Sequence, residues 1–180
     1  VKETKELDLL RRLAHCTRYI DDLWNPLVDK TTFQSIAQEI YPDWLQLGLE
    51  HEGEKVNYLD MTIWQQDGPW QSQLYDKRVE LQAKGLKLNK FPHSETKIAT
   101  RCRYGVISSQ LHRFKTVCTQ TSQFLDAATT LYTEYIDKGY DQRLVDKRVY
   151  KFLSRERDTL TIKPTAIKYC YQKQQLRARK

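Results

Sequence analysis

Two adjacent aspartates, Asp21 and Asp22, are the residues of this chain whose types and spacing most clearly suggest chemistry. They follow an aromatic and an aliphatic residue, Tyr19 and Ile20. Magnesium prefers hard oxygen ligands in octahedral geometry, and phosphoryl-transfer sites hold two such ions roughly 3.5–4 Å apart. Side-by-side carboxylates at a tight hairpin tip could bind such ions. Asp-Asp is also common in solvated turns and at helix starts, so the four residues alone leave both interpretations open.

The residues around the aspartates predict the hairpin that would position them. We expect its arms near residues 15–20 and 23–28, with the acidic turn exposed between them. Proline lacks a backbone N–H, so Pro26 limits the second arm to a sheet edge, a bulge or the strand end. Four apolar and aromatic residues are expected to bury the arms: Tyr19, Ile20, Leu23 and Trp24.

The elements around this hairpin follow from hydrophobic periodicity. Residues 2–14 have the pattern of an amphipathic helix. A second helix is predicted from Thr32, capped by Thr31 or Thr32 and ended by Pro42. Strand patterns follow at residues 47–49 and 59–63.

A second hairpin is predicted around the turn Gln66-Asp67-Gly68-Pro69, where Gly68 can adopt a positive φ. Its returning strand is expected over residues 70–77. Residues 79–100 are polar and weakly periodic, so we expect a connecting loop.

Beyond Arg103 the hydrophobic period becomes helical and predicts three helices. The first covers the apolar positions from Val106 to Val117, and the second runs from a cap at Ser122 to Gly139. The third begins near Asp141, with an inner side made of Leu144, Val145, Val149, Phe152 and Leu153. Three consecutive helices with short connections predict a small bundle.

Positive charge accumulates toward the C-terminus. Net charge is −6 over residues 1–69, +5 over residues 70–140 and +8 over residues 141–180. A strongly basic end is typical of a phosphate-backbone partner, although a merely solvated basic tail is the alternative. Eleven cations are candidate nucleic-acid contacts: Arg101, Arg103, Arg113, Arg143, Lys147, Arg148, Lys151, Arg155, Lys168, Lys173 and Arg177.

Four of these cations, Arg143, Lys147, Lys151 and Arg155, recur at every fourth residue of the third predicted helix. Such a row suits contact with phosphates and also suits ordinary helix solvation. Residues 159–180 contain six cations and no acid. A free segment of that composition would normally be disordered, so we expect a basic tail held by RNA or a large assembly.

The order of several short motifs resembles the C-terminal part of Penelope-like retroelement reverse transcriptases and their algal and protist relatives. The motifs are Tyr19-Ile20-Asp21-Asp22, Tyr58-Leu59-Asp60, Tyr75-Asp76-Lys77, Gln110-Leu111-His112-Arg113 and Cys118-Thr119. The resemblance covers roughly residues 15 to 155. It implies that Asp21, and Asp22 beside it, bind catalytic Mg²⁺ and that Tyr19 lies at the primer end.

The resemblance also implies an α+β fold, with a partial palm of antiparallel hairpins and packing helices followed by a three-helix thumb-like bundle and a basic tail. The expected segments are a palm at 1–78, a connecting loop at 79–100, a helical thumb at 101–158 and the tail at 159–180. A complete polymerase of this type needs another aspartate-bearing strand and fingers upstream. Only 14 residues precede His15, so we expect the catalytic carboxylates to be incomplete without a partner segment.

Composition narrows the class of protein. The 180 residues can bury a core, and no apolar run approaches the ~20 residues that a membrane span needs. The cysteines Cys16, Cys102, Cys118 and Cys170 lack the spacing of a zinc site, and they suggest a reducing intracellular compartment, either the nucleus or an organelle such as the mitochondrion.

Two functions follow as expectations. In the first, the chain is a nucleic-acid-binding C-terminal fragment of a reverse transcriptase, inactive alone, whose partners are RNA or an RNA/DNA hybrid and a second polypeptide. In the second, it is a domesticated RNA-binding subunit of a ribonucleoprotein such as an organellar ribosome. Neither function involves a membrane.

Overall fold

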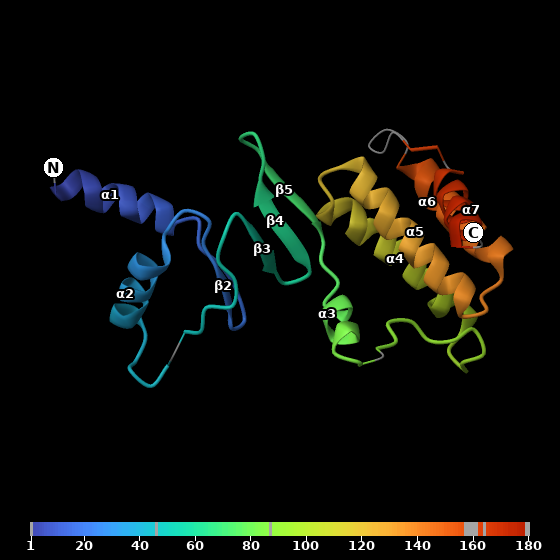
Figure 1. The fold of residues 1–180 in the computed structure, drawn as a ribbon, viewed down its shortest axis with the longest axis horizontal. Coiled ribbons are helices and arrows are strands. Elements are labelled where there is room, and N and C mark those ends of the chain that lie inside the picture. The colour runs from blue at the N-terminus through green and yellow to red at the C-terminus, as the bar shows by residue number, and fades with distance from the viewer. Residues whose placement is uncertain (1, 46, 87, 157–161, 164, 179–180) are drawn as a thin grey trace. The chain divides into compact units, whose positions relative to one another are not determined.

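A computed structural model describes residues 2–45, 47–86, 88–156, 162–163 and 165–178, without the side chains of residues 2–4, 177 and 178 (Figure 1). Within these ranges there are seven helices and five strands. The strands include two antiparallel pairs, β1 (Thr17–Tyr19) with β2 (Asp22–Trp24) and β4 (Met61–Gln65) with β5 (Trp70–Leu74). The α+β class is therefore confirmed, and the assignment to palm and thumb stays a prediction.

The chain divides into two compact units, residues 1–59 and residues 60–180. The first unit contains α1 (Lys2–Leu13), β1 (Thr17–Tyr19), β2 (Asp22–Trp24), α2 (Lys30–Ile40) and β3 (Lys55–Tyr58). The second contains β4 (Met61–Gln65), β5 (Trp70–Leu74), α3 (Arg78–Ala83), α4 (Thr100–Val117), α5 (Thr121–Asp137), α6 (Gln142–Arg155) and α7 (Ala166–Ala178). The predicted palm segment 1–78 thus extends across both units.

The acidic hairpin is present, with shorter arms than the sequence predicts. Thr17 pairs with Trp24, and Tyr19 pairs with Asp22, which leaves a two-residue tip. Ile20 reaches the tip with φ 55°, an uncommon conformation for a β-branched residue. The second arm ends at Trp24, so Pro26 lies just past the strand end. A proline is tolerated there because no strand partner needs its missing N–H.

The expected burial of the hairpin arms is wrong for two of the four residues. Tyr19 and Ile20 are 56% and 73% exposed, whereas Leu23 and Trp24 are half-buried. Trp24 stacks on Tyr58, with 5.9 Å between the ring centroids. One end of the hairpin is therefore packed, and its tip is solvated.

Helix α2 begins two residues before the predicted start. Its cap is Asp29, whose carboxylate accepts hydrogen bonds from the Thr32 N–H at 3.0 Å and from the Thr31 and Thr32 hydroxyls at 2.6 and 2.8 Å. These bonds hold the pKa of Asp29 well below its usual range. The helix ends at Ile40, just before Pro42, as predicted.

The first unit buries little of its apolar surface. Ala37, which is 8% exposed, is the one buried side chain among those described in residues 1–59. Large apolar side chains such as Ile40 and Trp44 remain exposed. The structure describes residues 47–49 and has no strand there, so this strand prediction is wrong. Hydrophobic burial therefore contributes little to holding this unit together.

The β4-β5 hairpin is fastened to the helices of the second unit. Met61 pairs with Leu74, and Gln65 pairs with Trp70, around a turn in which Gly68 has φ 100°. The Ser72 hydroxyl donates to the Val117 carbonyl at 2.6 Å, and the Thr119 N–H donates to the Ser72 carbonyl at 3.0 Å. The second hairpin thus packs with the helical bundle.

The three predicted helices correspond to α4, α5 and α6. Their facing sides form one core that contains Ile107, Leu111, Phe124, Tyr132, Tyr135, Val145, Val149, Phe152 and Leu153. Gln120, in place of the predicted Ser122, caps α5 through a reciprocal pair with Gln123, and Gly139 ends it with φ 75°. Leu144, expected on the inner side of α6, is exposed.

The predicted loop 79–100 is partly helical, because α3 occupies its start. The following segment is fixed to α5 and its C-terminal turn. Phe91 is buried beside Tyr135, Lys138 Nζ donates to the Phe91 carbonyl at 2.6 Å, and the Tyr140 hydroxyl donates to the Pro92 carbonyl at 3.1 Å.

The segment predicted as a basic tail, residues 159–180, contains a packed helix in its described part. Residues 166–178 form α7, which packs along α5 (Figure 1). Ile167 is fully buried, and Tyr171 lies against Tyr132 with ring centroids 5.0 Å apart. Residues 157–161, 164, 179 and 180 lie outside the described residues. Among the described helices, none has the length and apolar character that a membrane span requires.

The burial of Ile167 predicts that α7 is an integral part of the fold. Ile167→Ala should lower the free energy of unfolding by about 2–5 kcal/mol, because it leaves a cavity beside α5. Tyr169→Ala, on the exposed side of α7, is the matched control and should change it by about 0.5 kcal/mol or less. Urea unfolding followed by circular dichroism measures both, and equal midpoints would contradict the packing.

Candidate nucleic-acid interface

The acidic pair lies at the solvated tip of the first hairpin. Asp21 and Asp22 are both exposed, and Tyr19 beside them is exposed as well. Within the described residues, no group of three or more acidic, histidine or cysteine side chains is arranged to hold a metal ion. The hairpin therefore presents two carboxylates without a third ligand from the described part of the chain, and Mg²⁺ binding stays a prediction.

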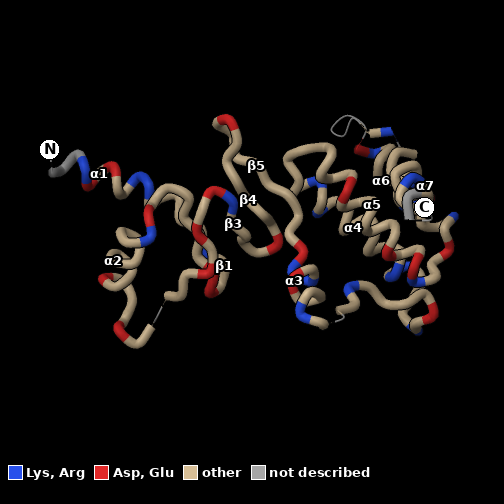
Figure 2. The backbone as a smooth tube through the Cα atoms, viewed as in Figure 1, with Lys and Arg blue, Asp and Glu red and all other residues tan. Residues whose placement is uncertain are grey.

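The two units differ strongly in charge. Residues 1–59 contain 7 basic and 11 acidic side chains, whereas residues 60–180 contain 23 basic and 12 acidic ones. Figure 2 shows these positions along the backbone. A partner that carries phosphates would therefore be attracted to the second unit.

The outward side of α6 carries the row of cations that the sequence predicts. Arg143, Lys147, Lys151 and Arg155 are all exposed, and Arg148 is half-buried. Among the described residues, no carboxylate forms an ion pair with any of these five side chains. We call this surface, Arg143, Lys147, Arg148, Lys151 and Arg155, the α6 cationic face.

The acidic residues near the α6 cationic face bind other partners, so they do not neutralise its cations. Asp146 accepts hydrogen bonds from the Tyr132 hydroxyl and from Lys168 Nζ, each at 2.6 Å. Glu156 pairs with Lys115. Burial and the bond to Asp146 raise the pKa of Tyr132 above its usual range, so its hydroxyl stays a donor.

One residue of this surface was missed by the sequence analysis. Tyr150 is 56% exposed and lies three residues after Lys147 on the same side of the helix. Its ring offers a flat surface between cations, which suits stacking with an unpaired base. Two features of the sequence could have identified Tyr150. It lies three residues after Lys147, and it does not belong to the apolar pattern of α6.

The predicted arginines of α4 have different environments. Arg101 is exposed, while Arg103 is half-buried, with its guanidinium 6.0 Å from the Tyr140 ring centroid. The start of α4 lies beside the start of α6, because the Asp141 N–H donates to the Tyr104 hydroxyl at 3.1 Å. The turn of α4 that carries Arg101 and Arg103 is therefore near the start of α6.

Arg113 is engaged within the fold, because its guanidinium forms an ion pair with Asp60. It therefore links α4 to the residue before β4. Among the predicted cations of the tail, Lys168 is paired with Asp146, and Lys173 is exposed on α7. The side chain of Arg177 lies outside the described residues.

Comparisons of the chain with protein-family models, curated proteins and solved structures find no match. The resemblance to reverse transcriptases therefore remains a hypothesis that rests on the motifs of the sequence.

The ion pair of Arg113 predicts a role in stability. Arg113→Gln should lower the free energy of unfolding by about 1 kcal/mol or less, since both partners are about one-third exposed. Asp60→Asn should produce a similar loss, and RNA affinity should change little in Arg113→Gln. A large loss of RNA affinity without a change in stability would instead place Arg113 in the interface.

Proposed function

We propose that this chain binds nucleic acid through the α6 cationic face, as the C-terminal part of a protein related to reverse transcriptases. The observation that carries the proposal is the exposed row of cations on one helix, with no pairing carboxylate among the described residues. Uncompensated cations favour a polyanion, because neutralising phosphates releases condensed counterions.

The length of the α6 cationic face suits a nucleic-acid strand. Four residues of helix rise about 6 Å, so Arg143 to Arg155 extends over about 18 Å. That distance spans several phosphates of one strand. With Tyr150 among the cations, the surface favours RNA that contains unpaired bases, since these can stack on an aromatic ring.

Catalysis is proposed to require more than this chain. In a polymerase of the type that the motifs resemble, Asp21 and Asp22 would bind Mg²⁺, which would stabilise charge during in-line phosphoryl transfer, and Tyr19 would lie beside the primer end. A further carboxylate would have to come from a partner segment. The alternative, an RNA-binding subunit of a ribonucleoprotein, uses the same cationic face and no metal.

Removing two charges from the α6 cationic face should change how RNA affinity depends on salt concentration. The double variant Lys147→Gln/Lys151→Gln should bind single-stranded RNA more weakly. The slope of log affinity against log salt concentration should be shallower by roughly 1.4, because two phosphate contacts are lost. Fluorescence anisotropy with a labelled RNA, measured over a salt series, gives both quantities.

A matched control separates this effect from net charge. Lys84→Gln/Lys97→Gln removes the same charge at two exposed positions outside α6, and it should leave the slope near that of the unmodified chain. Equal effects of the two double variants would mean that RNA binding depends on overall charge, and the proposed face would be refuted.

The proposed Mg²⁺ site leads to a separate prediction. The purified chain with Mg²⁺, an RNA template and a DNA primer should show no extension above background, because two carboxylates alone do not complete a two-metal site. Robust extension that Asp21→Asn abolishes would overturn this prediction. Co-purifying RNA whose binding is unchanged in Asp21→Asn would favour the ribonucleoprotein subunit.

A further inference from the structure

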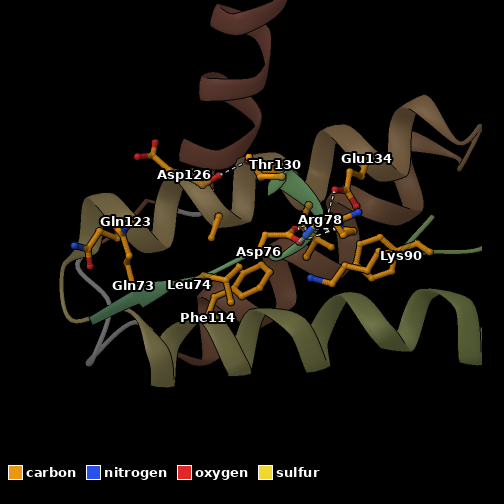
Figure 3. Close-up of a pocket in the computed structure, with 14 residues that line it drawn as sticks. Gln73, Leu74, Asp76, Arg78, Lys90, Phe114, Gln123, Asp126, Thr130 and Glu134 are labelled. Atoms are coloured by element: carbon orange, nitrogen blue, oxygen red, sulfur yellow. Dashed lines mark hydrogen bonds and ion pairs between the residues drawn. The ribbon is translucent and has the colours of Figure 1, made fainter. Parts of the chain in front are cut away.

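A cavity of about 340 Å³ lies in the second unit between β5, α3, α4 and α5 (Figure 3). None of its lining residues belongs to α6, so it is distinct from the α6 cationic face. Cavities of this size hold small organic molecules, which usually contact apolar walls and a few fixed polar groups.

The apolar part of the cavity is formed by core residues. Phe91, Phe114 and Leu131 are buried, and Leu74 packs against the same core. Two aromatic rings among the lining residues favour a flat ligand, because such ligands can stack on or pack edge to face with a ring.

One wall is polar and held in place by an arginine between two carboxylates. Arg78 Nε donates to Asp76 Oδ1 at 2.9 Å, and Arg78 Nη2 donates to Glu134 Oε1 at 2.7 Å. Figure 3 shows the three side chains converging at one end of the cavity. The hydrogen bond from Arg78 lowers the pKa of Asp76, so this carboxylate stays ionised and the wall keeps its arrangement.

Two groups at this end lack hydrogen-bond partners among the described residues. Glu134 Oε2 is buried and accepts no hydrogen bond. Lys90 is half-buried, its Nζ lies 5.7 Å from the Phe91 ring centroid, and no hydrogen bond or ion pair to it is found in the described ranges. Burial lowers the pKa of Lys90, as expected for an ammonium partly removed from water. A ligand that satisfies both groups would recover the cost of their burial.

We propose that this cavity binds an unpaired nucleobase, with Glu134 Oε2 accepting from an N–H on the edge of the base and Lys90 Nζ donating to an adjacent carbonyl oxygen. The base would lie against Phe91 and Phe114. Unpaired bases in RNA are commonly held in this way, by aromatic contact and by hydrogen bonds to their edges. The choice of a nucleobase among flat amide-bearing molecules rests on the proposed function.

Neutral nucleosides test the cavity independently of the α6 cationic face, because they carry no phosphate. Inosine and uridine each have a ring N–H beside a carbonyl, and 1-methylinosine and 3-methyluridine lack that N–H. We expect saturable binding of at least one parent nucleoside to the full chain, at least tenfold weaker for its methylated form. A two-dimensional ¹H–¹⁵N NMR titration should place the shifts at residues 76–78, 90–91 and 130–134.

Matched variants assign the contacts. Glu134→Gln keeps an oxygen for Arg78 and turns the free oxygen into a donor, and Lys90→Met keeps the apolar stem without the charge. Each should weaken nucleoside binding at least tenfold. Glu95→Gln and Lys84→Met make the same changes at exposed positions outside the cavity and should bind normally. Circular dichroism checks that each variant is folded.

The two proposals fail in different ways. No saturable nucleoside binding, or equal binding of parent and methylated forms, would overturn the cavity proposal even if RNA binding still depends on Lys147 and Lys151. Nucleoside binding that Glu134→Gln and Lys90→Met leave unchanged would overturn it as well. If nucleosides bind as expected while Lys147→Gln/Lys151→Gln has no effect on RNA, the cavity stands and the proposed face is refuted.

Discussion

The pairing of acids with cations inside the second unit decides which charges face outward. Four carboxylates hold basic partners at the junctions between elements: Asp60 with Arg113, Glu134 with Arg78, Asp146 with Lys168, and Glu156 with Lys115. Each pair adds little stability by itself where it is exposed. Together they leave the outward side of α6 with five cations and no paired acid among the described residues, which is the surface that a polyanion would bind.

The position of this surface depends on α5. Tyr132, buried on α5, donates to Asp146 of α6, and the same carboxylate accepts from Lys168 of α7. One carboxylate therefore joins three helices, and its two donors fix α6 by polar contacts as well as by its core residues. Two residues further along α5, Glu134 takes part in the wall of the cavity. The cationic face and the cavity thus depend on one helix.

Much of this arrangement could be predicted from the sequence, because local sequence patterns determine it. The acidic hairpin follows from the aspartate pair and the residues around it, and the second hairpin follows from its turn residues with Gly68. The inner positions Val145, Val149 and Phe152 follow from the helical period of 3.6 residues. Tertiary contacts could not be predicted from local patterns. Residues 166–178 have the composition of a basic tail, and the structure packs Ile167 into the core and Tyr171 against Tyr132 of α5. Arg113 was predicted only as a phosphate contact, and in the structure it forms an ion pair with Asp60, 53 residues earlier in the chain. The cavity was not predictable, since its groups come from segments far apart in the chain.

Lysine footprinting tests the central claim most directly. The full chain is acetylated under limiting conditions with and without a single-stranded RNA, and modified positions are quantified by mass spectrometry. The account predicts that RNA protects Lys147 and Lys151 from acetylation. Lys84 and Lys97, which are also exposed, should stay reactive. Protection at Lys84 and Lys97 with continued modification of Lys147 and Lys151 would contradict it.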